Sequence, residues 1–173
     1  AKAGFKGVEY VGPYAFPKAQ VAEALQSNGL KQVLFNLPAG NWDGGERGIA
    51  CLPDRVGEFQ DSVGLTIDYA KALDCTTVNC LAGLLPASVP HDKAWATMAA
   101  NLSFAAKALK QEGILLIIEP INFYDMPGFL LNTSKQGIAM IDTVGSDNLK
   151  LHYALYHMHR MEGELAATLT HLM

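Results

Sequence analysis

Five predicted strands alternate with five predicted helices along this chain, and no other feature of the sequence constrains the fold so strongly. Short aliphatic segments indicate the strands, and apolar residues recurring every three or four positions indicate the helices. The predicted strands are 6–12, 30–36, 76–82, 114–122 and 148–156, and the predicted helices are 17–29, 54–73, 94–109, 134–144 and one final helix with Met158, Met161, Leu165, Leu169 and Leu172 on one face. This order is typical of right-handed βαβ units, which build a parallel sheet covered by helices.

Two architectures contain strands and helices in this order: an open doubly wound sheet and a (β/α)8 barrel. The first predicted strand is not followed by a GxGxxG or P-loop segment, which disfavours a nucleotide-binding sheet. Polar residues instead lie at or near the carboxyl ends of successive strands, namely Glu9, Asn36, Asn79 and Glu119. Because a barrel builds its active site at that edge, the sequence predicts a partial (β/α)8 TIM barrel of the α/β class, with about five parallel βα units.

The barrel is expected to be incomplete. A complete one takes about 250 residues and eight strands, whereas the 173 residues here provide five clear strands. The first residues, AKAGF, are typical of the end of a helix whose strand is missing. We therefore expect residues 1–173 to form a single incomplete TIM-barrel domain. Since open sheet edges favour association with other strands, self-association into a homo-oligomer is also expected.

The composition and charge argue against several classes of partner. Half of the residues are hydrophobic and 17% are charged, which is typical of one folded core. The formal charge of -4 and the pI near 5.7 disfavour nucleic acid and anionic membranes, because both require a concentrated positive surface. The apolar runs are shorter than the roughly 20 residues of a membrane-spanning helix, and the N-terminus has no hydrophobic signal segment, so a cytoplasmic location is expected. Three cysteines without a paired spacing are expected to be reduced packing residues.

Glu119 is the first candidate for chemistry, because it ends the aliphatic run Ile114 to Ile118. A charge in such apolar surroundings is costly to bury unless it is paired, coordinated or used. One interpretation is a structural carboxylate that caps a loop or pairs with an arginine. The other is a catalytic base or metal ligand whose pKa is tuned by its apolar surroundings. The position at the end of a barrel strand favours the second interpretation.

Arg47 is a candidate for binding the substrate. It lies in the loop Gly44 to Gly48, which combines glycine flexibility with a fixed cation. The planar guanidinium of arginine can hold both oxygens of a carboxylate. An ion pair with Glu46 or Asp43 within the loop fits the spacing equally well. Trp42, in the same loop, is expected either to wall off a pocket or to anchor the loop.

Three histidines, His152, His157 and His159, form a tract near the last predicted strand. Such a tract can indicate a metal site, but an HxH pair without a third ligand is a weak signal. A hydrogen-bonding role for His157 at the mouth of the pocket is the preferred interpretation. Glu9 and Asn36, at earlier strand ends, are further candidates for binding substrate. Glu9 as a buried partner of a neighbouring polar residue is the alternative.

Four stretches resemble hydroxypyruvate isomerases, which belong to the xylose isomerase-like barrels: GFKGVEYVGPY, NLPAGNWDGGERGIACLP, ILLIIEPINFYDMPGF and YHMHRMEGEL. The resemblance covers essentially the whole chain. It implies a (β/α)8 barrel that interconverts hydroxypyruvate and tartronate semialdehyde by proton transfer through an enediol. It also implies that Glu119 is one of two catalytic glutamates and a ligand of a divalent cation, Mg²⁺ or Mn²⁺. Arg47 and His157 match pocket positions of that family.

The sequence departs from this family in three ways. Ala154 stands where the family has an aspartate, and Phe35 where a histidine is usual. The first strand and the last two strands, which would include the second glutamate, have no counterpart in the chain. The resemblance therefore implies that cation binding is weakened or absent and that activity is impaired. A ketose epimerase or isomerase of the same barrel group is the alternative enzyme, and a non-catalytic barrel fragment that binds a ligand or partner chain is the alternative from another class.

Overall fold

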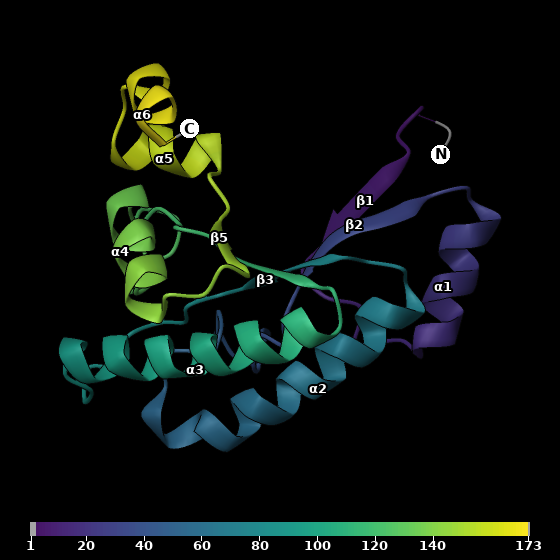
Figure 1. Ribbon diagram of the computed structural model, residues 1–173, viewed down its shortest axis with the longest axis horizontal. Helices are drawn as coiled ribbons and strands as arrows, with labels where there is room; N and C mark the ends of the chain where they lie inside the picture. The colour runs from purple at the N-terminus through teal and green to yellow at the C-terminus, as the bar shows by residue number, and fades with distance from the viewer. Residues whose placement is uncertain (1–2, 173) are drawn as a thin grey trace.

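The computed structural model describes residues 3–172, and within them five parallel strands form one sheet (Figure 1). The strands lie side by side in chain order: β1 (Gly7–Tyr10), β2 (Lys31–Asn36), β3 (Thr77–Cys80), β4 (Leu115–Ile118) and β5 (Leu149–Leu151). All four neighbouring pairs are parallel. The prediction of about five parallel βα units is therefore confirmed.

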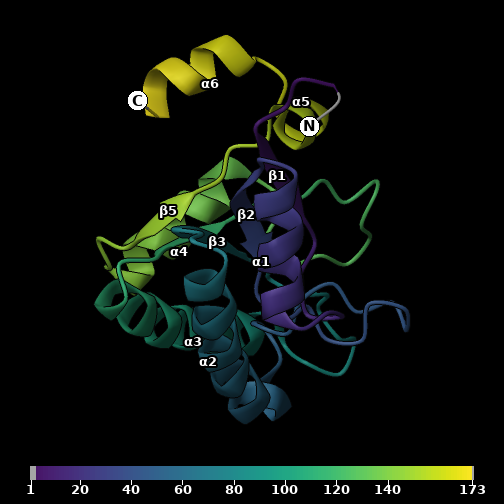
Figure 2. The same cartoon turned by 90° about the vertical axis from the view of Figure 1, so that its right-hand side faces the viewer.

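Four helices cover the convex side of this curved sheet: α1 (Lys18–Ser27), α2 (Val56–Ala72), α3 (His91–Gln111) and α4 (Ser134–Val144) (Figures 1 and 2). A 3-10 turn, Pro53–Arg55, precedes α2. The core lies between the sheet and these helices, and its largest buried side chains include Phe35, Phe59, Met98, Leu102, Leu109, Leu116, Ile118, Met140 and Leu149. Burial of each such side chain stabilises the fold by roughly 1.5–3 kcal/mol.

A bulge between β1 and β2 decides which residues of β2 face the concave side. Val8 pairs with Gln32, but Glu9 pairs with Leu34, so Val33 is an extra residue on β2. After this bulge, Phe35 packs in the helix-covered core, whereas Leu34 and Asn36 line a cavity on the other side. The alternation of side chains along a strand thus turns the polar end of β2 toward the candidate site.

The C-terminal part differs from the prediction. The strand predicted for 148–156 ends at Leu151, and the predicted final helix is two helices, α5 (Leu155–Met161) and α6 (Leu165–Leu172). Gly163 and Glu164 separate them with φ angles of 64° and 35°. The apolar spacing continues across this break, so the spacing alone predicted one helix, although a glycine in the left-handed region commonly ends one.

Two further sequence expectations can be compared with the fold. Cys51, Cys75 and Cys80 are all free and buried, as predicted for packing residues. In the described range, 3–172, no helix has both the length and the apolar character that crossing a membrane would require.

Candidate active site

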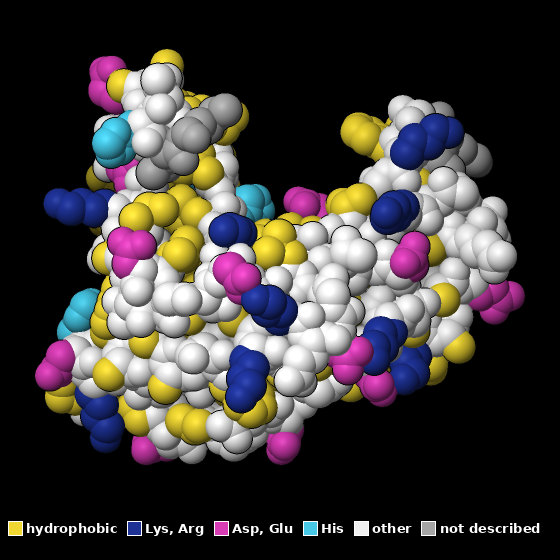
Figure 3. All heavy atoms as spheres, viewed as in Figure 1, with side chains coloured by type: hydrophobic (Ala, Val, Ile, Leu, Met, Phe, Trp, Pro, Cys, Tyr) yellow, Lys and Arg dark blue, Asp and Glu magenta, His cyan; other side chains and the backbone are white. Residues whose placement is uncertain are grey.

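A cavity of about 260 Å³ opens at the carboxyl ends of the strands, on the side of the sheet opposite to helices α1 to α4. Figure 3 shows the hollow between the part of the molecule that carries α4 to α6 and the part that carries β1. The cavity is lined by Glu9, Tyr10, Val11, Leu34, Asn36, Asn79, Glu119 and His152. Three predicted site residues, from β1, β2 and the end of β4, therefore line one cavity.

Glu119 follows directly on β4, and its side chain is 16% exposed. Its two carboxylate oxygens face two histidines: Oε2 lies 3.7 Å from Nδ1 of His152, and Oε1 lies 3.8 Å from Nε2 of His157. Burial raises the pKa of the Glu119 carboxyl above its ordinary value, the histidines act in the opposite direction, and Glu9 raises it further. A carboxylate with a raised pKa is a stronger base than one in water, which suits proton abstraction.

Two asparagines form the floor of the cavity on neighbouring strands. Asn36 and Asn79 are paired in register, and Nδ2 of Asn79 donates to Oδ1 of Asn36 at 2.9 Å. The hydroxyl of Tyr14 donates to the backbone oxygen of Asn36, also at 2.9 Å. The side-chain NH₂ group of Asn36 donates no hydrogen bond within residues 3–172, and Asn36 lines the cavity, so this group is available as a donor to a substrate oxygen.

The structure reveals a second histidine at Glu119 that the sequence placed only within a histidine-rich tract. His152 lies one residue beyond β5, and its backbone N–H donates to Ile118 at 2.9 Å, so it continues the pairing with β4. Successive side chains of a strand point to opposite faces, and Leu149 is a buried core residue. His152, three positions later, is therefore expected on the opposite face, which is the face toward the cavity. His159 is exposed and does not line the cavity.

Arg47 lies in a separate hollow, lined by residues 44–48 with Leu52, Leu84 and Pro86, and does not line the Glu119 cavity. Its guanidinium donates to the backbone oxygens of Trp42 at 2.9 Å and Glu46 at 2.7 Å. The guanidinium carbon also lies 4.1 Å from the centre of the Trp42 ring, a cation–π contact. Trp42 is therefore the stacking partner of Arg47.

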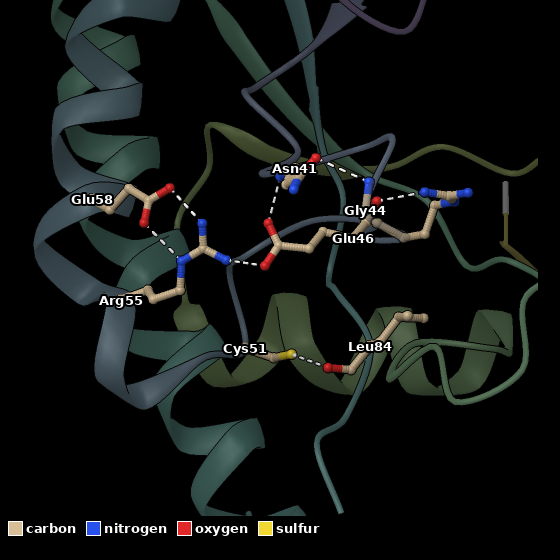
Figure 4. A network of polar contacts seen from close by, with 8 residues as sticks. Asn41, Gly44, Glu46, Cys51, Arg55, Glu58 and Leu84 are labelled. Carbon is tan, nitrogen blue, oxygen red and sulfur yellow. Dashed lines mark hydrogen bonds and ion pairs between the residues drawn. The ribbon is translucent and has the colours of Figure 1, made fainter.

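The Glu46 carboxylate pairs with Arg55 rather than with Arg47 (Figure 4). Glu46 also accepts a hydrogen bond from the backbone N–H of Asn41, and Arg55 pairs in turn with Glu58. The alternative ion pair between Arg47 and Glu46 is thus not formed. Within residues 3–172, the Arg47 guanidinium forms no ion pair. The Glu46 carboxylate is neutralised by Arg55.

The donor atoms near Glu119 do not by themselves fit Mg²⁺ or Mn²⁺, which prefer several oxygen ligands. Residues 3–172 contain no group of three His, Cys, Asp or Glu side chains placed to share one ion. Ala154 is the N-cap residue of α5, and its methyl group offers no ligand. The carboxylates that line the cavity in this part of the chain are those of Glu9 and Glu119.

Comparisons of sequence and structure identify proteins that resemble this chain along nearly its whole length. The sequence model of the family described as xylose isomerase-like TIM barrel matches residues 1–172. Hydroxypyruvate isomerase of Escherichia coli is 49% identical over 170 residues, covering 98% of this chain and 66% of that protein. 2-Oxo-tetronate isomerase of Cupriavidus necator is 40% identical over 166 residues, covering 96% of this chain and 64% of that protein. The chain thus spans a little under two thirds of the length of these curated relatives.

Two solved structures show the same architecture. The crystal structure of AP endonuclease, family 2, from Brucella melitensis superposes with a TM-score of 0.95 at 34% identity, covering 99% of this chain and 66% of that one. The structure of L-ribulose 3-epimerase superposes with a TM-score of 0.74 at 28% identity, covering 98% of this chain and 57% of that one. The sheet of five parallel strands with its outer helices therefore corresponds to part of each of these structures.

Proposed function

The chain belongs to the xylose isomerase-like TIM barrel family, and from this membership and the geometry at Glu119 we propose that it is an isomerase of small hydroxy-keto acids. The proposed reaction interconverts hydroxypyruvate and tartronate semialdehyde. The observation that carries the proposal is the Glu119 carboxylate, which is largely buried and lies between His152 and His157. Similarity to hydroxypyruvate isomerase and 2-oxo-tetronate isomerase supports the substrate class.

In the proposed mechanism, Glu119 takes a proton from the hydroxymethyl carbon of hydroxypyruvate. The electron pair of the broken C–H bond forms the double bond of an enediol, and the carbonyl oxygen gains a proton. Glu119 then returns its proton to the former carbonyl carbon, and the other hydroxyl gives its proton to solvent, which supplied the proton gained by the carbonyl oxygen, so that the aldehyde forms. We assign hydrogen bonds to the substrate oxygens to His157, whose Nε2 lies 3.8 Å from Glu119, and to the NH₂ group of Asn36, which lines the cavity. Glu9, which lines the same cavity, is a further residue proposed to bind the substrate.

We further propose that residues 1–173 form one barrel-type domain and that this chain turns over hydroxypyruvate slowly. The reason for low activity is Ala154, which replaces a family aspartate, together with the incomplete cation site around Glu119. A divalent cation, when bound, would polarise the substrate oxygens. The direct test is an assay of the purified chain with hydroxypyruvate: rapid, Glu119-dependent turnover would contradict the proposed impairment, and no Glu119-dependent reaction would contradict the isomerase function.

Replacing Ala154 by aspartate is expected to restore part of the cation site. We expect Ala154→Asp to raise the affinity for Mn²⁺ by about 10-fold or more, because it adds an oxygen ligand and a negative charge. The new side chain also caps α5, which should stabilise the fold by about 1 kcal/mol. Isothermal titration calorimetry with Mn²⁺ measures the first effect, and urea unfolding measures the second.

Ala154→Asn is the matched control for this variant, since asparagine caps a helix as well as aspartate but carries no charge. It should show the same gain in stability and little gain in Mn²⁺ affinity. Equal Mn²⁺ affinity in the two variants would mean that position 154 does not belong to a cation site.

Replacement of Arg47 distinguishes the proposed function from the second candidate, which is epimerisation or isomerisation of an uncharged ketose. The likeness to L-ribulose 3-epimerase and the position of Arg47 outside the Glu119 cavity favour this alternative. If the substrate is a carboxylate held by Arg47, Arg47→Ala should raise the KM for hydroxypyruvate by about 10- to 100-fold, which corresponds to one charge-assisted hydrogen-bonded pair. Steady-state kinetics over a panel of hydroxy-keto acids and uncharged ketoses measures this effect.

Arg47→Lys serves as the control for charge, because lysine keeps the cation and loses the planar fork. An intermediate KM is expected for it. A preference for uncharged ketoses in the parent chain, unaffected by Arg47→Ala, would favour the epimerase alternative.

A further inference from the structure

Asn122 is a fully buried side chain next to the site, and its orientation is fixed by a backbone group. It lies three residues after Glu119, in the loop between β4 and α4. The backbone N–H of Asp125 donates to Oδ1 of Asn122 at 3.0 Å. A backbone N–H can only donate, so this atom of the amide is the oxygen and the other is the nitrogen. Nδ2 of Asn122 then donates to Oδ2 of Asp125 at 2.9 Å.

The same nitrogen of Asn122 faces the imidazole of His157. Nδ2 of Asn122 lies 2.8 Å from Nδ1 of His157, and the backbone nitrogen of Asn122 lies 3.4 Å from it. Both Asn122 groups are donors, so Nδ1 of His157 is the acceptor. A neutral imidazole with an acceptor at Nδ1 carries its proton on Nε2. Nε2 is the atom that lies 3.8 Å from Oε1 of Glu119.

Further contacts hold this arrangement in place. Oδ2 of Asp125 accepts a second hydrogen bond from the Tyr156 hydroxyl at 2.7 Å, so the loop is tied to the first turn of α5. The side chain of Asn132 donates to the backbone oxygen of Ile121 at 2.9 Å. His152 has no equivalent support, because its buried Nδ1 has no hydrogen-bond partner among the described residues. The hydrogen bonds at Nδ1 therefore fix the tautomer of His157, whereas no hydrogen bond at Nδ1 fixes that of His152.

We propose that Asn122 is a positioning residue that fixes His157 as the Nε2–H tautomer. In this state Nε2 donates a hydrogen bond to a substrate oxygen while Glu119 takes the proton from carbon. The Nε2 atom cannot then serve as a base, because it already carries a proton, so proton abstraction falls to Glu119. The donor role rests on the proposed isomerase function, whereas the tautomer itself does not.

The tautomer can be measured in the intact chain without any substrate. Long-range nitrogen–proton NMR correlations distinguish Nε2–H from Nδ1–H imidazoles, and the signals missing from His157→Gln assign His157. Near neutral pH we expect the Nε2–H pattern for His157. An Nδ1–H pattern would overturn the proposal.

A paired exchange of side chains tests whether Asn122 is the cause. The double variant Asn122→Asp with Asp125→Asn keeps the net charge and the carboxylate–amide contact, but it turns a carboxylate oxygen toward Nδ1 of His157. We expect the tautomer to change to Nδ1–H, and deuterium exchange at the hydroxymethyl carbon of hydroxypyruvate to slow by about 10- to 100-fold, as for loss of one oriented donor. Asn28→Asp makes the same chemical change at the end of α1, outside this loop, and should keep the Nε2–H pattern.

The outcomes separate this proposal from the proposed function. An unchanged tautomer in the double variant would overturn the role of Asn122. A changed tautomer with an unchanged exchange rate would overturn the donor role of His157. If the parent chain shows no Glu119-dependent exchange, the isomerase function fails, and the NMR result alone decides whether Asn122 fixes the tautomer.

Discussion

Glu119→Gln is expected to slow deuterium exchange at the hydroxymethyl carbon of hydroxypyruvate by about 10²- to 10⁴-fold, the range typical of losing a general base. Glutamine keeps the size of the side chain but cannot accept a proton from carbon near neutral pH. Exchange with deuterium oxide is followed by the loss of the substrate proton signal in NMR. It reports proton abstraction alone, so it remains measurable when the complete isomerisation is slow.

Glu58→Gln is the matched control for this experiment. It makes the same chemical change at an ion pair with Arg55, and Glu58 does not line the Glu119 cavity. We expect no change of exchange rate in this variant. If Glu119→Gln exchanged deuterium as fast as Glu58→Gln, Glu119 would not be the base.

Thermal unfolding separates loss of chemistry from loss of folding in Glu119→Gln. Burial raises the pKa of the Glu119 carboxyl above its unfolded value, so folding favours the protonated form. The associated stability is present at low pH and is lost as the pH rises through the folded-state pKa. Above the folded-state pKa the ionised carboxylate therefore costs stability, and at such pH Glu119→Gln should melt at the same temperature as the parent chain or higher.

The order of strands and helices could be predicted because burial imposes local periodicity. Glu119 could be predicted for a related reason: a charge directly after four strand residues that are largely buried stands out in the sequence. The boundaries were less accurate where one pattern continues into another element. Apolar residues keep their helical spacing from Met158 to Leu169, although Gly163 and Glu164 interrupt the helix.

The partners of Glu119 and His157 could not be predicted from local pattern. Asn122 and His157 are 35 residues apart in the chain, and their contact depends on how the loop after β4 meets α5. The position of Arg47 was also beyond prediction, because spacing allowed an ion pair with Glu46 that Arg55 takes instead. Side-chain contacts between distant segments follow from packing, which leaves no periodic signal in the sequence.

Gly48→Ala is expected to lower the free energy of unfolding by about 3 kcal/mol or more, since it combines overpacking with a strained backbone. Gly48 has a φ of 112°, and a Cβ atom there would lie 2.4 Å from the backbone oxygen of Leu81. Gly83 faces it with a φ of 103°, and a Cβ on Gly83 would lie 2.7 Å from the backbone oxygen of Gly48. The two backbones approach closely because neither residue has a side chain. Urea unfolding measures the loss.

Gly45→Ala isolates the steric part of this effect. Gly45 has a similar φ of 96°, but a Cβ atom there would have no neighbour within 4 Å. Only the backbone cost, about 1–2 kcal/mol, is therefore expected. A larger loss in Gly48→Ala would show that the loop is held against the chain after β3, which fixes where Arg47 lies relative to the strand ends. Equal losses would mean that the loop can move away from β3, and Arg47 would then be free to approach the Glu119 cavity when a carboxylate binds.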